Sequence, residues 1–386
     1  MDFQLSFEQQ MILDYGENLA QNFGADYWRE KSLAQEFPLQ LWQQIAADGF
    51  LGVMVSEQYG GAGLGMTEMA LLMEGLSAAG LPLFMMVVGP TMTLSLIDHY
   101  GSEPLKQRYL PDGCSGEKVF CFAITEPNAG SNSMAITTLA KADGAGFKLN
   151  GQKAYITGAD AADYALVVAR TTPLKEAASK TDGFTLFMVD LKAPGVTIQA
   201  MDIPVMIPEK QCEVFFDNVE LGPDQVVGEV DRGFAILFDV LNPERIVVAA
   251  MAVGLGRYAL KQAVEYAGDR KVFGAPIGSH QGLAHPLAHA YTEIEMSALM
   301  TYKAAGNFDQ GAPAGAEANM AKYYAAEAAI NAVDKALQVN GGAGFTRDVG
   351  LLDLYSLVRL LRTIPVSREL LLNYIGEKVM GLPRSY

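Results

Sequence analysis

The chain has few residues of the kinds that build disulfide frameworks or metal centres. It has 386 residues, among them three cysteines (Cys114, Cys121 and Cys212) and four histidines. The cysteine count is odd and no C-x-x-C pair occurs, so we expect no disulfide framework. His285 and His289 are four residues apart, but no Cys or Glu completes a ligand pattern, so we expect no metal. Free thiols fit a reducing compartment and indicate a cytoplasmic protein.

Basic residues are also scarce. The chain has 28 Lys and Arg against 44 Asp and Glu, a formal net charge of −16. Binding to nucleic acid depends on a basic face that displaces counterions from phosphates, and no basic cluster occurs. We therefore expect no nucleic-acid partner, and the acidity is interpreted as favouring solubility.

Signals for export or membrane insertion are missing as well. The first residues, MDFQLSFEQQ, are acidic and amide-rich where a signal peptide carries basic residues, and no apolar segment follows. Residues 75–97 lack charge, but they contain Pro82 and Pro90 and several glycines. Prolines inside a lone span leave backbone groups unpaired in lipid, so this run predicts two buried helices joined by a turn.

The common nucleotide-binding loops are not found. No G-x-G-x-x-G follows a strand and opens a helix, which gives no support to a Rossmann site. Gly146–Lys153 reads G-x-x-x-x-G-Q-K and lacks the Lys-Ser/Thr of a phosphate loop. It predicts a strand that ends in an Asn-Gly turn.

The sequence patterns that are present indicate helices in the first part of the chain, strands in the middle part and helices in the last part. Residues 1–115 carry helical periodicity, and 116–230 carry short β-rich runs separated by Gly, Asn and Pro turns. Helical signals resume in 231–386. This order differs from the alternation of a doubly wound fold. We predict a multidomain α+β protein with an N-terminal helical domain, a central β-barrel or sandwich domain and a C-terminal helical bundle.

Three stretches carry candidate chemistry. Phe122–Ser131 reads F-A-I-T-E-P-N-A-G-S, a strand that enters a loop of hydroxyls and exposed backbone N–H groups. Arg270–Ile277 follows a long helical pattern, and Arg270 could bond helix carbonyls or a phosphate. Gln338–Phe345 holds three glycines within four positions, which suggests a ligand close to the backbone. Each signal alone is weak, since surface loops and helix caps often look similar.

Together these stretches resemble the acyl-CoA dehydrogenase family. The first is similar to its T-E-P-x-A-G-S flavin motif, and Tyr155-Ile156-Thr157 to its W-I-T strand. The second and third are similar to its R-x-x-F-G-x-x-I-x-x-x-Q and Q-x-x-G-G-x-G-F motifs. The order of helices, strands and helices matches too, so the resemblance covers nearly the whole chain. It implies an FAD enzyme that desaturates acyl-CoA, with a C-terminal four-helix bundle.

The resemblance implies roles for individual residues. One group, on the central domain, would hold the isoalloxazine and phosphates: Phe122, Ile124, Thr125, Gly130, Ser131, Tyr155 and Thr157. A second group would hold the FAD of a neighbouring subunit: Arg270, Phe273, Gln281, Gln338, Gly341 and Gly342. Ser367 would also bind FAD, and Ser131 and Arg245 would bind substrate. These roles imply a homotetramer, built as a dimer of dimers, that passes electrons to an electron-transfer flavoprotein.

The catalytic base departs from the commonest pattern of the family. Many members of the family have their catalytic Glu in an E-G-T triplet late in the chain. In this sequence the triplet falls at Pro365-Val366-Ser367, so the Glu is absent. A minority resembling isovaleryl-CoA dehydrogenase keeps its base on an earlier helix, directly before an Arg, and Glu244-Arg245 fits that place. Asn242 and Pro243 also look like the cap and first residue of an apolar helix. Glu244 could instead have only a structural role, in which its negative charge stabilises the N-terminal end of the helix.

Other functions stay open at this point. Relatives without the late Glu include oxygen-using flavin monooxygenases and oxidases, and the chain could be one subunit of a heteromeric dehydrogenase. Met85, Met86 and Met92 of the uncharged run could line an acyl cavity or simply pack in the core. Acyl length, branching, the thioester carrier and the effect of Pro365 on carbonyl binding are not indicated by the sequence.

Overall fold

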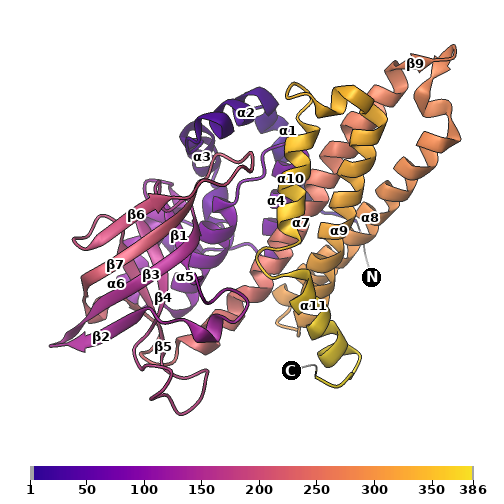
Figure 1. The fold of residues 1–386 in the computed structure, drawn as a ribbon. Helices are drawn as coiled ribbons and strands as arrows, with labels where there is room; N and C mark the ends of the chain where they lie inside the picture. Colours follow the sequence, from indigo (N-terminus) through magenta and orange to yellow (C-terminus); the bar gives the residue numbers. More distant parts are fainter. Residues whose placement is uncertain (1–3, 385–386) are drawn as a thin grey trace.

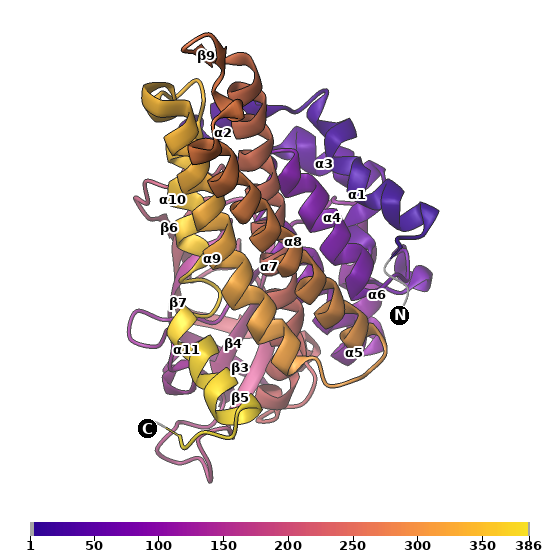
Figure 2. The same ribbon diagram turned by 90° about the vertical axis from the view of Figure 1, so that its right-hand side faces the viewer.

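A computed structural model describes residues 4–384 of the chain. The polypeptide forms a helical N-terminal part, a central sheet and a long C-terminal bundle (Figure 1). The sheet lies to one side, and the bundle helices run alongside the N-terminal helices on the other (Figures 1 and 2). The predicted order of helices, strands and helices is therefore confirmed, and the core continues through all three parts.

The N-terminal part consists of helices with short connections. Their bounds are α1 Phe7–Ala20, α2 Ala25–Ala34, α3 Leu39–Ala47, α4 Met66–Ala78, the π-helix η3 Val87–Leu94, α5 Ser95–Tyr100 and α6 Glu103–Cys114. Helix α1 begins at a capping box, in which Ser6 and Gln9 bond each other's backbone N–H groups. Helix α4 is buried along most of its length because it packs against both α1 and the bundle.

The uncharged run 75–97 forms two buried helices joined by a turn, as predicted. The chain leaves α4 at Ala78 and turns at Gly80 before it enters η3 and α5. Pro90 lies inside η3, where the wider π-helical turn accommodates a residue without an N–H group. No helix within residues 4–384 combines the length and the apolar character needed to cross a bilayer.

The central sheet has two four-stranded halves that meet at one residue pair. The bounds of its strands are β1 Phe120–Ala123, β2 Leu139–Asp143, β3 Gly146–Thr157, β4 Tyr164–Arg170, β5 Phe184–Asp190, β6 Val196–Ala200, β7 Gln211–Leu221 and β8 Val226–Val227. One half has the order β6-β7-β3-β2, and in the other β4 pairs with β1 and β5 and β5 with β8. Leu139 of β2 and Arg170 of β4 form the junction. Such a two-part sheet agrees with the predicted sandwich-like domain.

The C-terminal part is a bundle of long helices. Their bounds are α7 Gly233–Asp269, α8 Gln281–Asp309, α9 Gly315–Asn340, α10 Leu351–Leu361, α11 Arg368–Tyr374 and the π-helix η8 Ile375–Val379. Alanines line the buried face of α9, which lets α7 and α8 approach it closely. The hairpin β9–β10, Lys271–Pro276, joins α7 to α8 at one end of the bundle (Figure 1).

The predicted helix start at Asn242 and Pro243 is wrong. Helix α7 is continuous from Gly233, and Pro243 lies well inside it. An internal proline removes one backbone hydrogen bond, so the helix loses a donor at this turn. The carbonyl left without a helix donor is that of Asp239, four residues earlier, whereas the Arg245 side chain bonds a different carbonyl, with Nη1 donating to Leu241 at 2.8 Å. Packing along α7 therefore outweighs the local signal for a helix end.

Two glycines of α7 provide a matched test of this packing. A Cβ at Gly254 would lie 2.3 Å from the Glu74 carbonyl oxygen of α4, whereas a Cβ at Gly268 meets no atom within 4 Å. We expect Gly254→Ala to lower the free energy of unfolding by about 1–3 kcal/mol through overpacking. Gly268→Ala should raise it by up to about 1 kcal/mol through helix propensity. Chemical denaturation measures both, and equal effects would contradict the close α4–α7 contact.

Candidate active site

Glu244 lies on the inner side of the bundle, on helix α7. It is partly buried and directly precedes the fully buried segment Ile246–Gly256. Burial raises the pKa of Glu244 to about 7, and the positive charges of Arg245 and Lys322 offset part of that rise. A carboxyl group with this pKa ionises near neutral pH and can accept a proton there.

Arg245 is held close to its own helix turn. Its Nη1 donates to the Leu241 carbonyl at 2.8 Å and to Asn242 Oδ1 at 3.4 Å. Its Nε atom is buried and has no hydrogen-bond partner among residues 4–384. Burial lowers the pKa of Arg245, and the Glu244 charge counteracts that effect. A buried guanidinium with an unused donor is suited to bind an oxygen of a ligand.

A buried lysine that the sequence analysis did not single out lies beside these two residues. Lys322 of α9 is 1% exposed, and its Nζ donates to the Val366 carbonyl at 2.6 Å. Val366 belongs to the turn Ile364–Ser367, which precedes α11, and Ser367 caps that helix through Leu370 N–H. The turn with the Pro365-Val366-Ser367 triplet is thereby fixed to α9.

The loop Phe122–Ser131, which contains the stretch similar to the flavin motif and is called the flavin-motif loop below, is fixed to β3 by a second buried lysine. Lys153 Nζ donates to Glu126 Oε1 at 2.9 Å and to the Ile124 carbonyl at 2.8 Å. Glu126 also accepts hydrogen bonds from the backbone N–H groups of Thr137 and Thr138. Burial alone would raise the pKa of Glu126, but Lys153 and these donors lower it to about 2. The pair holds the loop between Phe122 and Ser131 in one conformation.

The predicted flavin residues of the central domain lie on this loop and at the end of β3. Phe122 is in β1, Ile124 and Thr125 follow it, and Thr125 accepts a hydrogen bond from Ala154 N–H. Tyr155 has a positive φ of 58° and is 58% exposed, although it lies within a strand. Such a backbone conformation is rare for an aromatic residue. It displays the Tyr155 ring at the surface of the sheet.

The second predicted group lies at the hairpin end of the bundle. Arg270 ends α7, Phe273 is in the β9–β10 hairpin, and Gln281 begins α8 (Figures 1 and 2). Gln338 and the glycines after it end α9. Gln338 is 16 residues after Lys322 on α9, or about 24 Å along a helix. The structure therefore does not bring this group and Glu244 together within one chain.

The two groups of predicted FAD-binding residues both have open space beside their glycines. A Cβ at Gly130, Gly341 or Gly342 would meet no atom within 4 Å. Phe273 is 97% exposed, and the aromatic ring of Tyr155 is available as well. Open glycine backbone suits phosphates and exposed rings suit a flat heterocycle, so these residues fit FAD.

The uncharged run approaches the predicted cofactor residues from the N-terminal part. Met85 is buried, and a Cβ at Gly158 would lie 2.3 Å from its sulfur. Gly158 directly follows Thr157, whose hydroxyl is bonded to Gln211. Glu209 is 1% exposed, and one of its carboxylate oxygens accepts a hydrogen bond from Met85 N–H. Burial raises the pKa of Glu209 to about 7, so it can carry a proton in this apolar surrounding.

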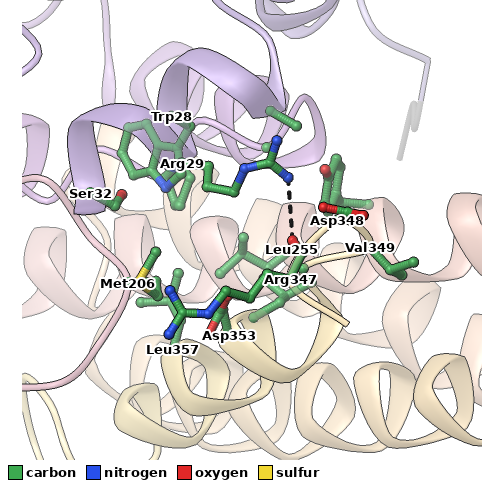
Figure 3. Close-up of a pocket in the computed structure, with 16 residues that line it drawn as sticks. Trp28, Arg29, Ser32, Met206, Leu255, Arg347, Asp348, Val349, Asp353 and Leu357 are labelled. Carbon is green, nitrogen blue, oxygen red and sulfur yellow. Dashed lines mark hydrogen bonds between the residues drawn. The ribbon is translucent and has the colours of Figure 1, made fainter. Parts of the chain in front are cut away.

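A separate pocket lies where the three parts of the chain meet (Figure 3). Trp28 and Ser32 of α2, Met206 of the β6–β7 loop and segment 347–357 line it, with a volume of about 90 Å³. Arg29 Nη1 donates across its rim to the Arg347 carbonyl at 3.3 Å (Figure 3). None of the residues predicted to act in catalysis or to bind FAD lines this pocket.

Comparison with protein families matches three segments of this chain. The acyl-CoA dehydrogenase N-terminal domain matches residues 6–117, the middle domain 121–219 and the C-terminal domain 231–380. Acyl-CoA dehydrogenase FadE12 of Mycobacterium tuberculosis is 45% identical over 383 residues, which cover 99% of this chain and 98% of that protein. This chain belongs to the acyl-CoA dehydrogenase family. The predicted family is thereby confirmed, and the enzyme is an FAD-dependent oxidoreductase that acts on acyl-CoA.

Solved structures agree with this assignment. A glutaryl-coenzyme A dehydrogenase in complex with glutaryl-CoA has a TM-score of 0.94 and 27% identity, covering 100% of this chain and 98% of that one. PigA with FAD and proline has a TM-score of 0.92 and 27% identity, covering 98% and 99%. The predicted fold class and the FAD cofactor are confirmed by these relatives.

Proposed function

We propose that this acyl-CoA dehydrogenase desaturates its substrate between Cα and Cβ, with Glu244 as the catalytic base. The carboxylate of Glu244 takes the α-proton, and the electron pair left at Cα forms the new double bond as a hydride leaves Cβ. FAD, when bound, supplies the acceptor for that hydride. The observation that carries the proposal is a partly buried carboxyl group on α7 that directly precedes Arg245 and the fully buried segment Ile246–Gly256. Burial raises the pKa of this carboxyl group to about 7.

The surrounding residues support this role. Glu244 directly precedes the fully buried apolar segment Ile246–Gly256, and an apolar surrounding makes a carboxylate more basic. Arg245 has an unused buried donor that could orient an oxygen of the substrate. Pro365 has no N–H group and lies in the turn fixed by Lys322, so its backbone cannot donate a hydrogen bond to the thioester carbonyl. The proposed substrate-binding residues are Arg245 and Ser131.

The residues proposed to hold FAD form two groups, from two subunits. The loop Phe122–Ser131 with Tyr155 and Thr157 would bind one part of the cofactor, and Ser367 would contribute from the turn. The hairpin end of the bundle would bind the FAD of a neighbour, because it lies far along α9 from Glu244. This separation supports an FAD site shared between two subunits. The proposed assembly is a homotetramer, and the proposed electron acceptor is an electron-transfer flavoprotein.

The pKa of Glu244 predicts how the reaction depends on pH. Only the ionised carboxylate can take the proton, and its pKa is about 7. The rate of flavin reduction should therefore fall about tenfold for each pH unit below that value and level off above it. Stopped-flow reduction between pH 5.5 and 9, with FAD retention checked at each pH, measures this. A flat profile would exclude a titrating base in this range.

A panel of acyl-CoA thioesters tests the activity itself. Purified protein with FAD should lose its flavin absorbance anaerobically with at least one straight or branched acyl-CoA, and the product should be the α,β-unsaturated thioester. Reduced enzyme should then react slowly with oxygen and rapidly with an electron-transfer flavoprotein. Fast oxygen consumption would favour an oxidase or monooxygenase, and no reduction by any thioester would contradict the proposal.

A further inference from the structure

Arg170, the last residue of β4, is a buried cation whose side chain bonds only backbone carbonyls. It is 2% exposed, and no residue among 4–384 forms an ion pair with it. Its N–H groups make four hydrogen bonds to four carbonyls, and its central carbon lies 4.2 Å from the centre of the Phe184 ring. Burying a guanidinium has a large desolvation cost, which such partners must offset. The guanidinium therefore fixes several stretches of backbone at once.

Two of these carbonyls belong to the segment 132–138, which joins the flavin-motif loop to β2. Arg170 Nη2 donates to the Met134 carbonyl at 2.7 Å, and Nε donates to the Ile136 carbonyl at 3.2 Å. The backbone N–H of Arg170 also donates to the Thr138 carbonyl, at 2.8 Å. Arg170 thus holds this segment at three successive points.

A second buried charge holds the same segment through its N–H groups. Glu126 is 5% exposed and accepts hydrogen bonds from two backbone N–H groups of segment 132–138. Residues 130–132, between these two sets of contacts, are exposed. Ser131 therefore lies in a short exposed stretch that is flanked by backbone bonded to Glu126 and to Arg170.

The other two carbonyls belong to the loop 171–183, which joins β4 to β5 and is mostly exposed. Arg170 Nη1 donates to the Asp182 carbonyl at 2.9 Å, and Nη2 donates to the Lys180 carbonyl at 3.3 Å. One guanidinium group thus joins segment 132–138 to this surface loop.

We propose that Arg170 is a positioning residue for substrate binding, which holds segment 132–138 and thereby places the Ser131 hydroxyl for the acyl thioester. The inference rests on the proposed role of Ser131 in binding substrate. The planar fork of an arginine offers five donors in fixed directions, so it bonds carbonyls on two sides at once, whereas the ammonium group of a lysine is a single point. Arg170 itself contacts neither substrate nor cofactor in this scheme.

Two substitutions of Arg170 remove its hydrogen bonds to different extents. Arg170→Lys keeps the charge and the apolar stem but loses the fork, and Arg170→Met removes every side-chain donor. Arg108→Lys is the matched control, because Arg108 is exposed and pairs with Asp224 at the surface. Retained FAD absorbance shows that each variant is folded. If Arg170→Met does not fold, Arg170→Lys carries the test alone.

Hydrogen exchange followed by mass spectrometry tests the hydrogen bonds themselves. We expect Arg170→Lys to raise the exchange rates of segment 132–138 and of loop 171–183 together, by about tenfold or more, because both lose hydrogen bonds to one anchor. Arg108→Lys should leave both rates unchanged. Unchanged exchange in segment 132–138 would overturn the inference, whatever happens in the loop.

A double-mutant cycle tests whether Arg170 acts through Ser131. Stopped-flow flavin reduction at varied acyl-CoA gives the half-saturating concentration and the limiting rate. Ser131→Ala should raise the first about fivefold with little change in the second, as expected for one lost substrate hydrogen bond. Arg170→Lys should have a similar effect, and adding Ser131→Ala to it should change the half-saturating concentration by less than about twofold, because the hydroxyl is already misplaced. Independent effects, with the full change in both backgrounds, would reduce Arg170 to a structural role and overturn the inference.

Failure of the proposed function gives a different pattern. Independent effects together with an inactive Glu244→Gln would overturn only the role of Arg170. Normal flavin reduction by Glu244→Gln would remove Glu244 as the base, and a coupled cycle would still support Arg170. No effect of Ser131→Ala in the wild-type background would remove Ser131 as a substrate-binding residue and this inference with it.

Discussion

Glu244→Gln should lower the rate of flavin reduction by acyl-CoA by about three orders of magnitude or more. Glutamine has nearly the same shape but cannot accept a proton, and a positioned base contributes about 10²–10⁴-fold. FAD content and substrate affinity should be retained, because the side chain stays close to isosteric. Stopped-flow reduction with the best acyl-CoA measures the rate, and equilibrium titration of the flavin spectrum measures affinity.

Glu265→Gln is the control for this substitution. Glu265 is on the same helix α7 but is exposed to solvent, so its replacement should leave the reduction rate unchanged. Reduction of the Glu244→Gln enzyme at near the wild-type rate would assign the base to another group. Loss of FAD from that variant would instead indicate a mainly structural role for Glu244.

Glu126→Gln should destabilise the protein by about 3–5 kcal/mol, because it leaves the Lys153 ammonium buried without its partner. Lys153 is fully buried and Glu126 is 5% exposed, so solvent cannot replace the lost charge. The flavin-motif loop is held by this pair, so FAD affinity should fall along with stability. Urea denaturation measures the first effect and FAD titration of the apoprotein the second.

The Glu126–Lys153 ion pair also predicts how the free energy of unfolding changes with pH. The pKa of Glu126 is lowered from 4.5 to about 2 in the folded state, so its stabilisation is present above about 4.5 and is lost as the pH falls toward 2. The free energy of unfolding should therefore decline over that acid range less steeply in Glu126→Gln than in wild type. Asp143→Asn is the control, since its ion pair with Lys148 is exposed and should be worth about 1 kcal/mol or less. Equal losses in the two variants would contradict the buried-pair argument.

The overall fold could be predicted because periodicity and turn residues reflect burial directly. The helical periodicity of residues 1–115 corresponds to the helices α1 to α6, and the β-rich region 116–230 contains the strands β1 to β8. Strand β2 carries no β-rich run of its own. It contains Lys141 and Asp143 and lies partly exposed, so its stability comes from pairing with β3 rather than from its own composition. The Asn-Gly turn predicted to end the strand at Gly146–Lys153 is wrong, because β3 continues to Thr157 and Asn150-Gly151 lies at a bulge within it.

Residues of the candidate site could be predicted only where they belong to a recognisable sequence motif. The loop 122–131, Tyr155 and the two glycine-rich stretches were found through their resemblance to a family, and their functional roles stay predictions. Lys153 and Lys322 were not found, because a lysine in a strand or an alanine-rich helix usually points to solvent. The only sequence signal for Lys322 is its spacing from Ala318, Ala325 and Ala329, which lie on the buried face of α9. The Asn242-Pro243 signal failed because packing of the whole of α7 outweighed one local break.

The continuity of α7 has a consequence for the assembled enzyme. Glu244 and Arg270 are 26 residues apart along one unbroken rod, or about 39 Å at the rise of an α-helix. In the proposed tetramer, Glu244 inside this helix takes the proton in its own subunit, and the C-terminal end of the same helix holds the cofactor of the next. Neither position can shift along the axis without the other, so the spacing between neighbouring reaction centres is set by a single helix.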